Sequence, residues 1–149
     1  MKLKLKAVSP KIGRELPWPQ RATTGSAGMD LSACIEEDII LSPRQLVRIP
    51  TGIAIALPGP EYVALVYARS GLGIKHGIAL SNGVGVIDSD YRGEIQVGLT
   101  NLSDEPYTIQ PGDRIAQLMV VPVGQAAVHE LEELPPTARG AGGFGSTGK

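Results

Sequence analysis

Glycine- and proline-containing turns interrupt this sequence at short intervals, which limits what the chain can fold into. The 149 residues include 19 glycines and 12 prolines, whereas aromatic residues make up only 4% of the chain. The runs between these turns are short, and several alternate polar with apolar residues as half-buried strands do. No run longer than a few residues has helical periodicity with capping residues. We therefore expect a single, mostly β domain with little helix.

The expected strands are joined by short connections. They comprise residues 2–8, 39–41, 45–49, 53–57, 62–68, 78–80, 84–87, 95–99, 107–109 and 115–121. The lysines of the first strand are typical of a sheet edge. The strand at 115–121 is apolar on both faces, whereas a strand on the outside of a single sandwich should show water one polar face. We therefore expect an oligomer interface at this strand.

Composition and charge exclude several classes of protein. The net charge of −1 argues against a broad basic surface, so we expect no nucleic-acid partner. Cys34 is the only cysteine, which excludes an internal disulfide, and the chain has too few Cys and His for a structural zinc site. The N-terminus alternates lysine with apolar residues, unlike a signal peptide, and no apolar run approaches membrane-spanning length. We expect a soluble, cytoplasmic protein without a membrane partner.

The stretch from Ser81 to Ile95 holds the strongest candidates for chemistry. Asn82-Gly83 predicts a type I′ hairpin turn, because both residues tolerate positive φ. Asp88 and Asp90 then follow a short apolar run, with Tyr91 next to them. A carboxylate at the rim of two strands can act as a general base. On this stretch alone, a solvated turn between strands is the alternative.

Two further segments are suited to anions. Arg69-Ser70-Gly71 combines a guanidinium, a hydroxyl and an accessible amide at a strand end, although an arginine-capped turn is the alternative. The glycine-rich stretch 140–145 formally matches G-x-G-x-x-G but lacks the strand before it and the helix after it that dinucleotide binding requires. Its amides are suited to folding over phosphates, and a disordered terminus is the alternative. Ser-His-Asp catalysis is not expected, since His76 lies in a turn and His129 among the charges of a last strand.

Five segments, in this order, resemble the five motifs of the trimeric dUTP pyrophosphatases (dUTPases). They are residues 27–31 (Ala-Gly-Met-Asp-Leu), 69–75 (Arg-Ser-Gly-Leu-Gly-Ile-Lys), 82–94, 112–117 (Gly-Asp-Arg-Ile-Ala-Gln) and 139–147 (Arg-Gly-Ala-Gly-Gly-Phe-Gly-Ser-Thr). Each segment alone is weak, but five at these spacings are highly specific. The resemblance covers nearly the whole chain from Ala27 onward.

The resemblance implies an all-β, jelly-roll-like barrel with short turns that forms a homotrimer. Residues 1–134 would form the barrel, and residues 135–149 a flexible glycine-rich tail that closes the active site. The implied activity is hydrolysis of dUTP to dUMP and pyrophosphate, which keeps uracil out of DNA and supplies dUMP for thymidylate synthesis. The implied cofactor is Mg²⁺, held through the substrate phosphates and water and not by protein ligands. Each active site would combine the Asp88 hairpin and the tail of different subunits.

The resemblance also implies roles for single residues. Asp88 would be the general base that activates a water for attack on the α-phosphorus, Tyr91 would pack under the deoxyribose, and Asp30 would be a supporting carboxylate. The other implied residues bind the substrate: Asn82 and the backbone of Ile95, Gln96 and Val97 at uracil; Arg69, Ser70, Gly71 and Gln117 at the phosphates; and Arg139, Phe144, Gly145, Ser146 and Thr147 in the closing tail, with Phe144 over the base.

Two other functions compete with this interpretation. A dCTP deaminase belongs to the same superfamily, but those chains are typically longer, lack the Phe-Gly-Ser tail pattern and carry a glutamate base, for which no residue here is suitably placed. A binding module would sense dUTP or a protein partner without turnover. The intact Asp88 argues against a role in binding alone.

Overall fold

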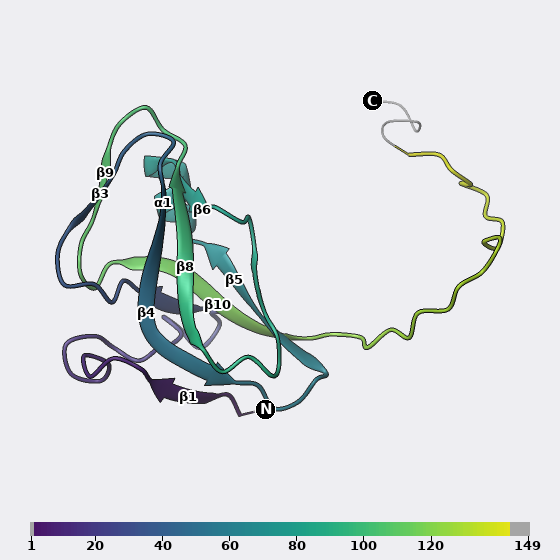
Figure 1. Cartoon of the computed structure of the whole chain (residues 1–149), viewed down its shortest axis with the longest axis horizontal. Helices are drawn as coiled ribbons and strands as arrows, with labels where there is room; N and C mark the ends of the chain where they lie inside the picture. The colour runs from purple at the N-terminus through teal and green to yellow at the C-terminus, as the bar shows by residue number, and fades with distance from the viewer. Residues whose placement is uncertain (1, 144–149) are drawn as a thin grey trace.

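The computed structural model describes residues 2–143 and arranges their strands in three antiparallel sheets (Figure 1). One four-stranded sheet has the order β1 (Lys4–Ala7), β4 (Leu46–Ala56), β8 (Glu94–Asn101), β6 (Ile78–Leu80), and the other has the order β2 (Met29–Ser32), β10 (Arg114–Pro122), β5 (Tyr62–Ala68), β7 (Gly85–Ile87). The strands β3 (Ile39–Leu41) and β9 (Tyr107–Ile109) form a small third sheet, and a short helix α1 (Ser70–His76) follows β5. The expected all-β, jelly-roll-like fold with little helix is confirmed, and β1 lies at a sheet edge as its lysines indicate.

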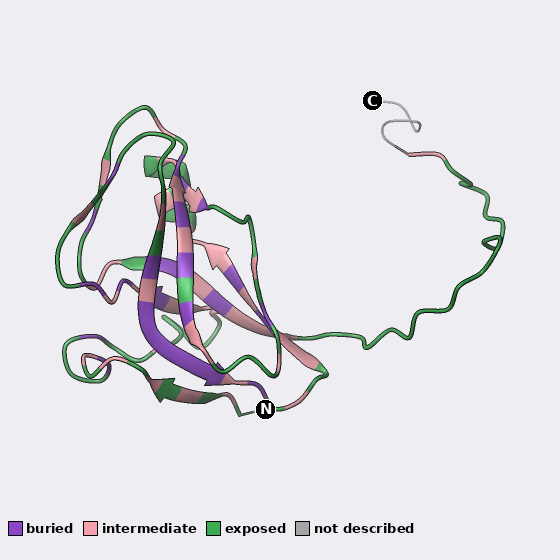
Figure 2. Ribbon diagram, viewed as in Figure 1, coloured by how far each residue is buried: buried purple, intermediate pink, exposed green. Residues whose placement is uncertain are grey.

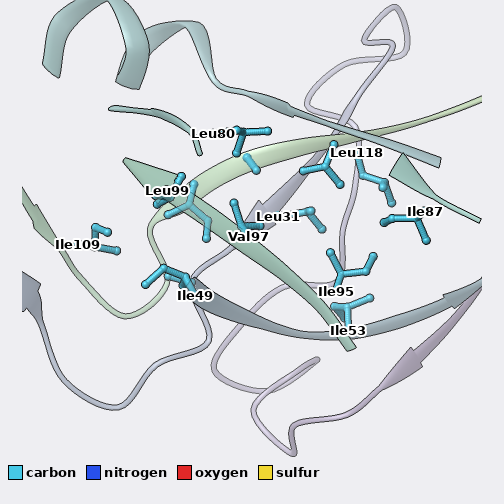
Figure 3. Packing of buried hydrophobic residues seen from close by; sticks show 14 of the residues in the cluster. Leu31, Ile49, Ile53, Leu80, Ile87, Ile95, Val97, Leu99, Ile109 and Leu118 are labelled. Carbon is cyan, nitrogen blue, oxygen red and sulfur yellow. The ribbon is translucent and has the colours of Figure 1, made fainter. Parts of the chain in front are cut away.

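The hydrophobic core lies between the two four-stranded sheets. Alternate residues of β8 face it, so that Ile95, Val97 and Leu99 are each at most 3% exposed. Leu118 of β10 and Leu31 of β2 approach from the other sheet and are equally buried (Figure 3). Burial is concentrated in the middle of the long strands, whereas connections and sheet edges are exposed (Figure 2). The alternation in the sequence therefore determines which face of the strand packs against the core.

The structure joins two predicted strands into one. Residues 45–49 and 53–57 were expected as separate strands because Pro50-Thr51-Gly52 lies between them, but they form the single strand β4 with a register shift between Pro50 and Ala54. The strand continues because side chains replace ladder hydrogen bonds at this bulge. The Thr51 hydroxyl donates to the Ile95 carbonyl at 2.7 Å, and the Gly52 N–H donates to Glu94 Oε1 at 2.7 Å.

The predicted type I′ hairpin at Asn82-Gly83 is wrong. The two strands around it lie in different sheets, since β6 pairs with β8 whereas β7 pairs with β5. Only Gly83 has a positive φ, of 73°, and the turn is closed by the Gly83 N–H donating to the Leu80 carbonyl at 3.2 Å. A type I′ turn aligns two strands as neighbours, whereas this turn carries the chain from one sheet to the other.

The last described strand is β10, and the chain leaves the barrel after it (Figure 1). The expectation of a strand around His129 is wrong, because residues 123–143 contain no helix or strand. Exposed glutamates and isolated apolar residues there have no partner strand in the described part of the chain. The proposed boundary between barrel and tail at residue 134 stays a prediction. Among residues 2–143, no helix has the length and hydropathy needed to cross a membrane.

Asn101 gives a direct test of how the end of β8 is held. Its side chain is 0% exposed, and its Nδ2 donates to the carbonyls of Leu41 at 2.9 Å and Glu105 at 2.7 Å. Its Oδ1 accepts from the N–H and the hydroxyl of Ser103 at 2.9 and 2.7 Å. Asn101→Ala removes all four bonds, and we expect it to lower the free energy of unfolding by at least about 2 kcal/mol, because buried polar groups are left unpaired.

Denaturant unfolding of Asn101→Ala beside Ser103→Ala measures this effect. Ser103→Ala keeps the backbone bond to Asn101 and removes only the hydroxyl, so a smaller loss is expected. Equal midpoints for Asn101→Ala and the unmodified chain would contradict the network's role.

Candidate active site

The first candidate cavity has a volume of about 420 Å³ and lies where β8 and β7 separate into different sheets. Its apolar walls come from strand residues that also border the core, such as Val66 and Ile87. Its polar groups come from the turns at the ends of these strands and from β4 and β8. The residues that line it are Arg48, Val66, Leu80, Asn82, Gly85, Val86, Ile87, Asp88, Tyr91, Glu94, Ile95, Gln96, Val97 and Gly98.

An open edge of β8 faces this cavity. Strand β6 pairs with β8 only from Leu99 to Asn101, and the Gly98 carbonyl accepts the Ser81 N–H at 2.9 Å on that same side. The Ile95 carbonyl instead bonds Thr51, on the β4 side. Because the N–H and C=O groups of successive residues point to alternate sides of a strand, the amide and carbonyl of Gln96 point toward the cavity. Of the three backbone residues named from the sequence, Gln96 therefore has the accessible groups.

Asp88 and Tyr91 stand at the two ends of one tight turn at the cavity rim. The Tyr91 N–H donates to the Asp88 carbonyl at 3.2 Å, and the Arg92 guanidinium donates to the carbonyls of Ser89 and Tyr91, both at 2.8 Å. Asp88 is exposed, and its carboxylate is accessible to a bound molecule and to water. The turn is thus fixed by its own hydrogen bonds, with the Asp88 carboxylate and the Tyr91 ring both lining the cavity.

A second cavity, of about 560 Å³, contains the anion-binding candidates. Arg69 follows the last residue of β5, and Ser70 and Gly71 begin α1, whose first amides have no acceptor within the helix. Gln117 of β10 donates from Nε2 to the Ala68 carbonyl at 3.0 Å and so lies beside Arg69. The residues lining this cavity are Ala22, Ser26, Ala27, Gly28, Asp30, Tyr67, Ala68, Arg69, Ser70, Gly71, Arg114, Gln117 and Met119.

Asp30 connects two arginines at this second cavity. Its Oδ1 accepts from Arg69 Nε at 3.0 Å, and its Oδ2 accepts from Arg114 Nη1 at 3.1 Å. Arg69 also donates from Nη1 to the Arg114 carbonyl at 3.3 Å. One carboxylate between two guanidiniums leaves a positive balance, so the cavity can attract an anion while the arginines stay in place.

A smaller cavity of about 190 Å³ lies behind the two arginines. Tyr107 and Asp113 line it together with apolar residues of the core. Burial, and to a lesser extent the Asp113 carboxylate, raises the pKa of Tyr107 above its ordinary 10.0, which keeps the phenol neutral. The Tyr107 ring also contacts that of His76, with 4.9 Å between centroids. Because His76 is the last residue of α1, this ring contact supports the helix.

The two large cavities lie on opposite sides of β5. Val66 lines the first cavity and Tyr67 lines the second, and successive residues of a strand face opposite sides. The predicted site residues thus fall into two groups within one chain. Asn82, Asp88, Tyr91 and the 95–97 backbone form one group, and Asp30, Arg69, Ser70, Gly71 and Gln117 form the other.

The structure brings the described part of the tail, residues 135–143, to neither cavity. Arg139 lies in the extended segment after β10, where its Nε donates to the Gly142 carbonyl at 2.8 Å (Figure 1). Phe144, Gly145, Ser146 and Thr147 lie outside the described residues. Sequence reasoning also missed Arg48 and Glu94 in the first cavity and Arg114 in the second. Arg114 belongs to the 112–117 motif, whereas the position of Arg48 depends on the pairing of β4 with β8.

The fold is jelly-roll-like, with an open strand edge in one cavity and two arginines joined by Asp30 in the other. These features define the class of protein as a β protein suited to binding a base and its phosphates. The dUTPase family matches residues 14–148. The chain is 53% identical over 146 residues to the deoxyuridine 5′-triphosphate nucleotidohydrolase of Ectopseudomonas mendocina, covering 98% of this chain and 97% of that protein. It is 49% identical over 149 residues to the enzyme of the same name from Acinetobacter baumannii, covering 100% and 99%.

Solved structures of dUTPases have a similar fold. A point mutant of the Staphylococcus bacteriophage 80alpha dUTPase with dUpNHpp has a TM-score of 0.86 at 27% identity, covering 99% of both chains. A point-mutant dUTPase of phage phi11 of S. aureus, solved with a structural Mg(II) ion, has a TM-score of 0.76 at 24% identity, covering 89% of this chain and 98% of that one. The chain belongs to the dUTPase family.

Proposed function

We propose that this protein hydrolyses dUTP to dUMP and pyrophosphate by attack of water on the α-phosphorus. The observation that carries the proposal is the first cavity, where the accessible backbone of Gln96 and the carboxylate of Asp88 line one space of about 420 Å³. When the uracil ring lies at the strand edge, the phosphates of the nucleotide would lie at the rim of the cavity, near the Asp88 carboxylate. The reaction would keep uracil out of DNA and supply dUMP for thymidylate synthesis in the cytoplasm.

The strand edge supports selection of uracil over cytosine. Uracil presents a donor at N3 between two carbonyl acceptors, and the Gln96 carbonyl and amide offer the complementary acceptor and donor. Cytosine has an acceptor at N3 and an amino group at C4, so it would leave buried groups unpaired, which costs affinity. Asn82 lines the same cavity and can bond the same base edge. The Tyr91 ring would fill the space that a 2′-hydroxyl needs.

The second cavity supports binding of the triphosphate. Arg69 and Arg114 supply positive charge, and Ser70, Gly71 and Gln117 supply further donors. A magnesium ion usually keeps several waters and binds through substrate phosphates and few carboxylates, so this donor set fits an ion carried on the triphosphate. Asp30 already accepts from two arginines and serves to hold them. When bound, Mg²⁺ would supply neutralisation of the charge on the leaving pyrophosphate.

Catalysis by the chain itself would rest on Asp88. Its carboxylate would accept a proton from the water that attacks the α-phosphorus, and the fixed turn from Asp88 to Tyr91 would keep that oxygen in place. The tail, with Arg139 and Phe144, would cover the base and phosphates.

The outer face of the sheet that contains β5 supports a homotrimer with shared sites. Leu65 pairs with Met119 and Val63 with Val121 on the side opposite the core, and Val86 beside Leu65 is 64% exposed. An apolar sheet face of this kind is stabilised by a second copy of the chain. The second cavity lies on this same outer side of β5. A nucleotide in the first cavity of one subunit would then meet the arginines of a neighbouring subunit.

Product analysis tests the proposed function. The purified protein with Mg²⁺ should release pyrophosphate from dUTP. Ammonia release from dCTP would instead indicate a deaminase, and tight dUTP binding without either product would indicate a binding module. The chain without Mg²⁺ and dCTP in place of dUTP are the controls.

A further inference from the structure

We propose that Gly93 and Glu94 are positioning residues that hold the Tyr91 ring in the wall of the first cavity and so set the discrimination against a 2′-hydroxyl. The inference rests on the function proposed above. It concerns how this chain keeps a partly exposed aromatic ring in one place, since Tyr91 is 46% exposed and lines the cavity.

Gly93 provides the space into which the ring folds back. A Cβ at this position would overlap the Tyr91 hydroxyl and the adjoining ring carbon. Gly93 is not among the glycines with positive φ, so its backbone suits any residue. The missing side chain, and not the backbone conformation, is therefore what the position requires. Because the overlapping atoms are the far end of a side chain, an added methyl group should displace the ring and leave the backbone unchanged.

Glu94 holds the same hydroxyl end of the ring. The Tyr91 hydroxyl donates to the Glu94 carbonyl at 3.0 Å. The Glu94 side chain in turn accepts the Gly52 N–H at 2.7 Å, at the bulge of β4. Gly52 has a φ of 70°, and a Cβ there would meet Cys34 Sγ at 2.9 Å, so this part of the bulge is fixed by close packing. The position of the ring is thus tied through Glu94 to a buried part of the first sheet.

A double-mutant cycle tests the role of Gly93. Wild type, Gly93→Ala, Tyr91→Ala and the double variant are compared by the ratio of kcat/KM for dUTP to that for UTP. Tyr91→Ala should lower this ratio by at least about 10-fold, the lower range for one misfitting group in a shaped pocket. Gly93→Ala should lower it by a similar factor, and the double variant should match Tyr91→Ala alone, because residues in contact act non-additively. Gly124→Ala, where a Cβ meets nothing within 4 Å, is the matched control.

Two results would overturn the role of Gly93 in positioning the ring. One is a wild-type ratio in Gly93→Ala, and the other is a double variant whose loss equals the product of the two single losses. A protein that does not hydrolyse dUTP at all would instead contradict the proposed function, and a Tyr91→Ala variant with the wild-type ratio would remove the ring's role as a filter and the inference with it. Melting temperatures of all variants show whether the fold is kept.

Glu94 supplies an independent variant. Glu94→Gln keeps a side-chain oxygen for the Gly52 N–H, whereas Glu94→Ala removes it. We expect Glu94→Ala to lower the dUTP-to-UTP ratio and Glu94→Gln to restore most of it. In the Tyr91→Ala background, Glu94→Ala should leave the ratio unchanged. A merely structural role for Glu94 would lower the melting temperature without changing the ratio, and this outcome would also overturn the inference.

Discussion

Replacing Asp88 by asparagine is expected to lower kcat for dUTP by at least about 10²-fold, the usual scale for a positioned general base. Asparagine has nearly the same shape, so the turn from Asp88 to Tyr91 and the cavity wall should be preserved. The amide cannot accept the proton of the attacking water, which is the physical reason for the loss. The affinity for dUTP should stay nearly unchanged, because the base and the sugar contact other residues.

Steady-state kinetics and equilibrium binding of a non-hydrolysable dUTP analogue separate these two effects. Asp90→Asn is the matched control, since Asp90 lies in the same turn but is not among the described residues that line the first cavity. Asp90→Asn should retain much more activity than Asp88→Asn. Full activity in Asp88→Asn would contradict its assignment as the base, and equal losses in both variants would indicate a general effect of charge in the turn.

The second large effect is expected from mixing two inactive proteins. Asp88→Asn lacks the base, and a chain ending at Ala138 lacks Arg139 and Phe144, so each should be nearly inactive alone. The truncated chain should keep its fold and oligomeric state, because the described residues that it loses, 139–143, are not buried and contribute no strand. The two proteins are unfolded together in equal amounts and refolded, so that subunits assemble at random.

Shared sites predict recovery of activity in this mixture. If the hairpin and the tail of one site come from different subunits, about a quarter of all sites receive both parts intact, the product of two independent halves in a closed ring. If both parts come from one chain, no site is intact, because every chain carries one lesion. Activity near a quarter of the wild-type value would support sharing, and activity no higher than that of each protein refolded alone would refute it.

The opposite positions of the two cavities on β5 are the structural reason to expect recovery. Tyr67 faces the arginine-lined cavity and Val66 the cavity with Asp88, so the strand separates the two groups within one chain. The described part of the tail also projects from the barrel (Figure 1). If one site uses both groups, as proposed, they would come from neighbouring copies of the chain.

Local patterns in the sequence were sufficient for most of the strands and for the candidate residues. Alternation identified β1 and the buried face of β8, because one face of a half-buried strand must be apolar to pack, and β-rich composition identified β5. The motifs around Arg69 and Asp88 gave the first candidate site residues, since their chemistry depends on residue type and spacing, and the resemblance to the dUTPases supplied the other candidates. The doubly apolar strand 115–121 likewise indicated that its outer face needs a partner.

Tertiary structure alone decided how these parts meet. Pro50 and Gly52 signal a break when only their neighbours are considered, yet hydrogen bonds that this segment donates to β8 allow the strand to continue. Asn82-Gly83 signals a hairpin, yet its flanking strands find partners in different sheets, and the first cavity opens between them. The accessible backbone of Gln96 likewise depends on contacts between residues distant in sequence. The space that Gly93 leaves for Tyr91 depends on contacts across a turn. Short-range patterns report which face of a strand is buried, whereas strand pairing depends on the packing of the whole barrel.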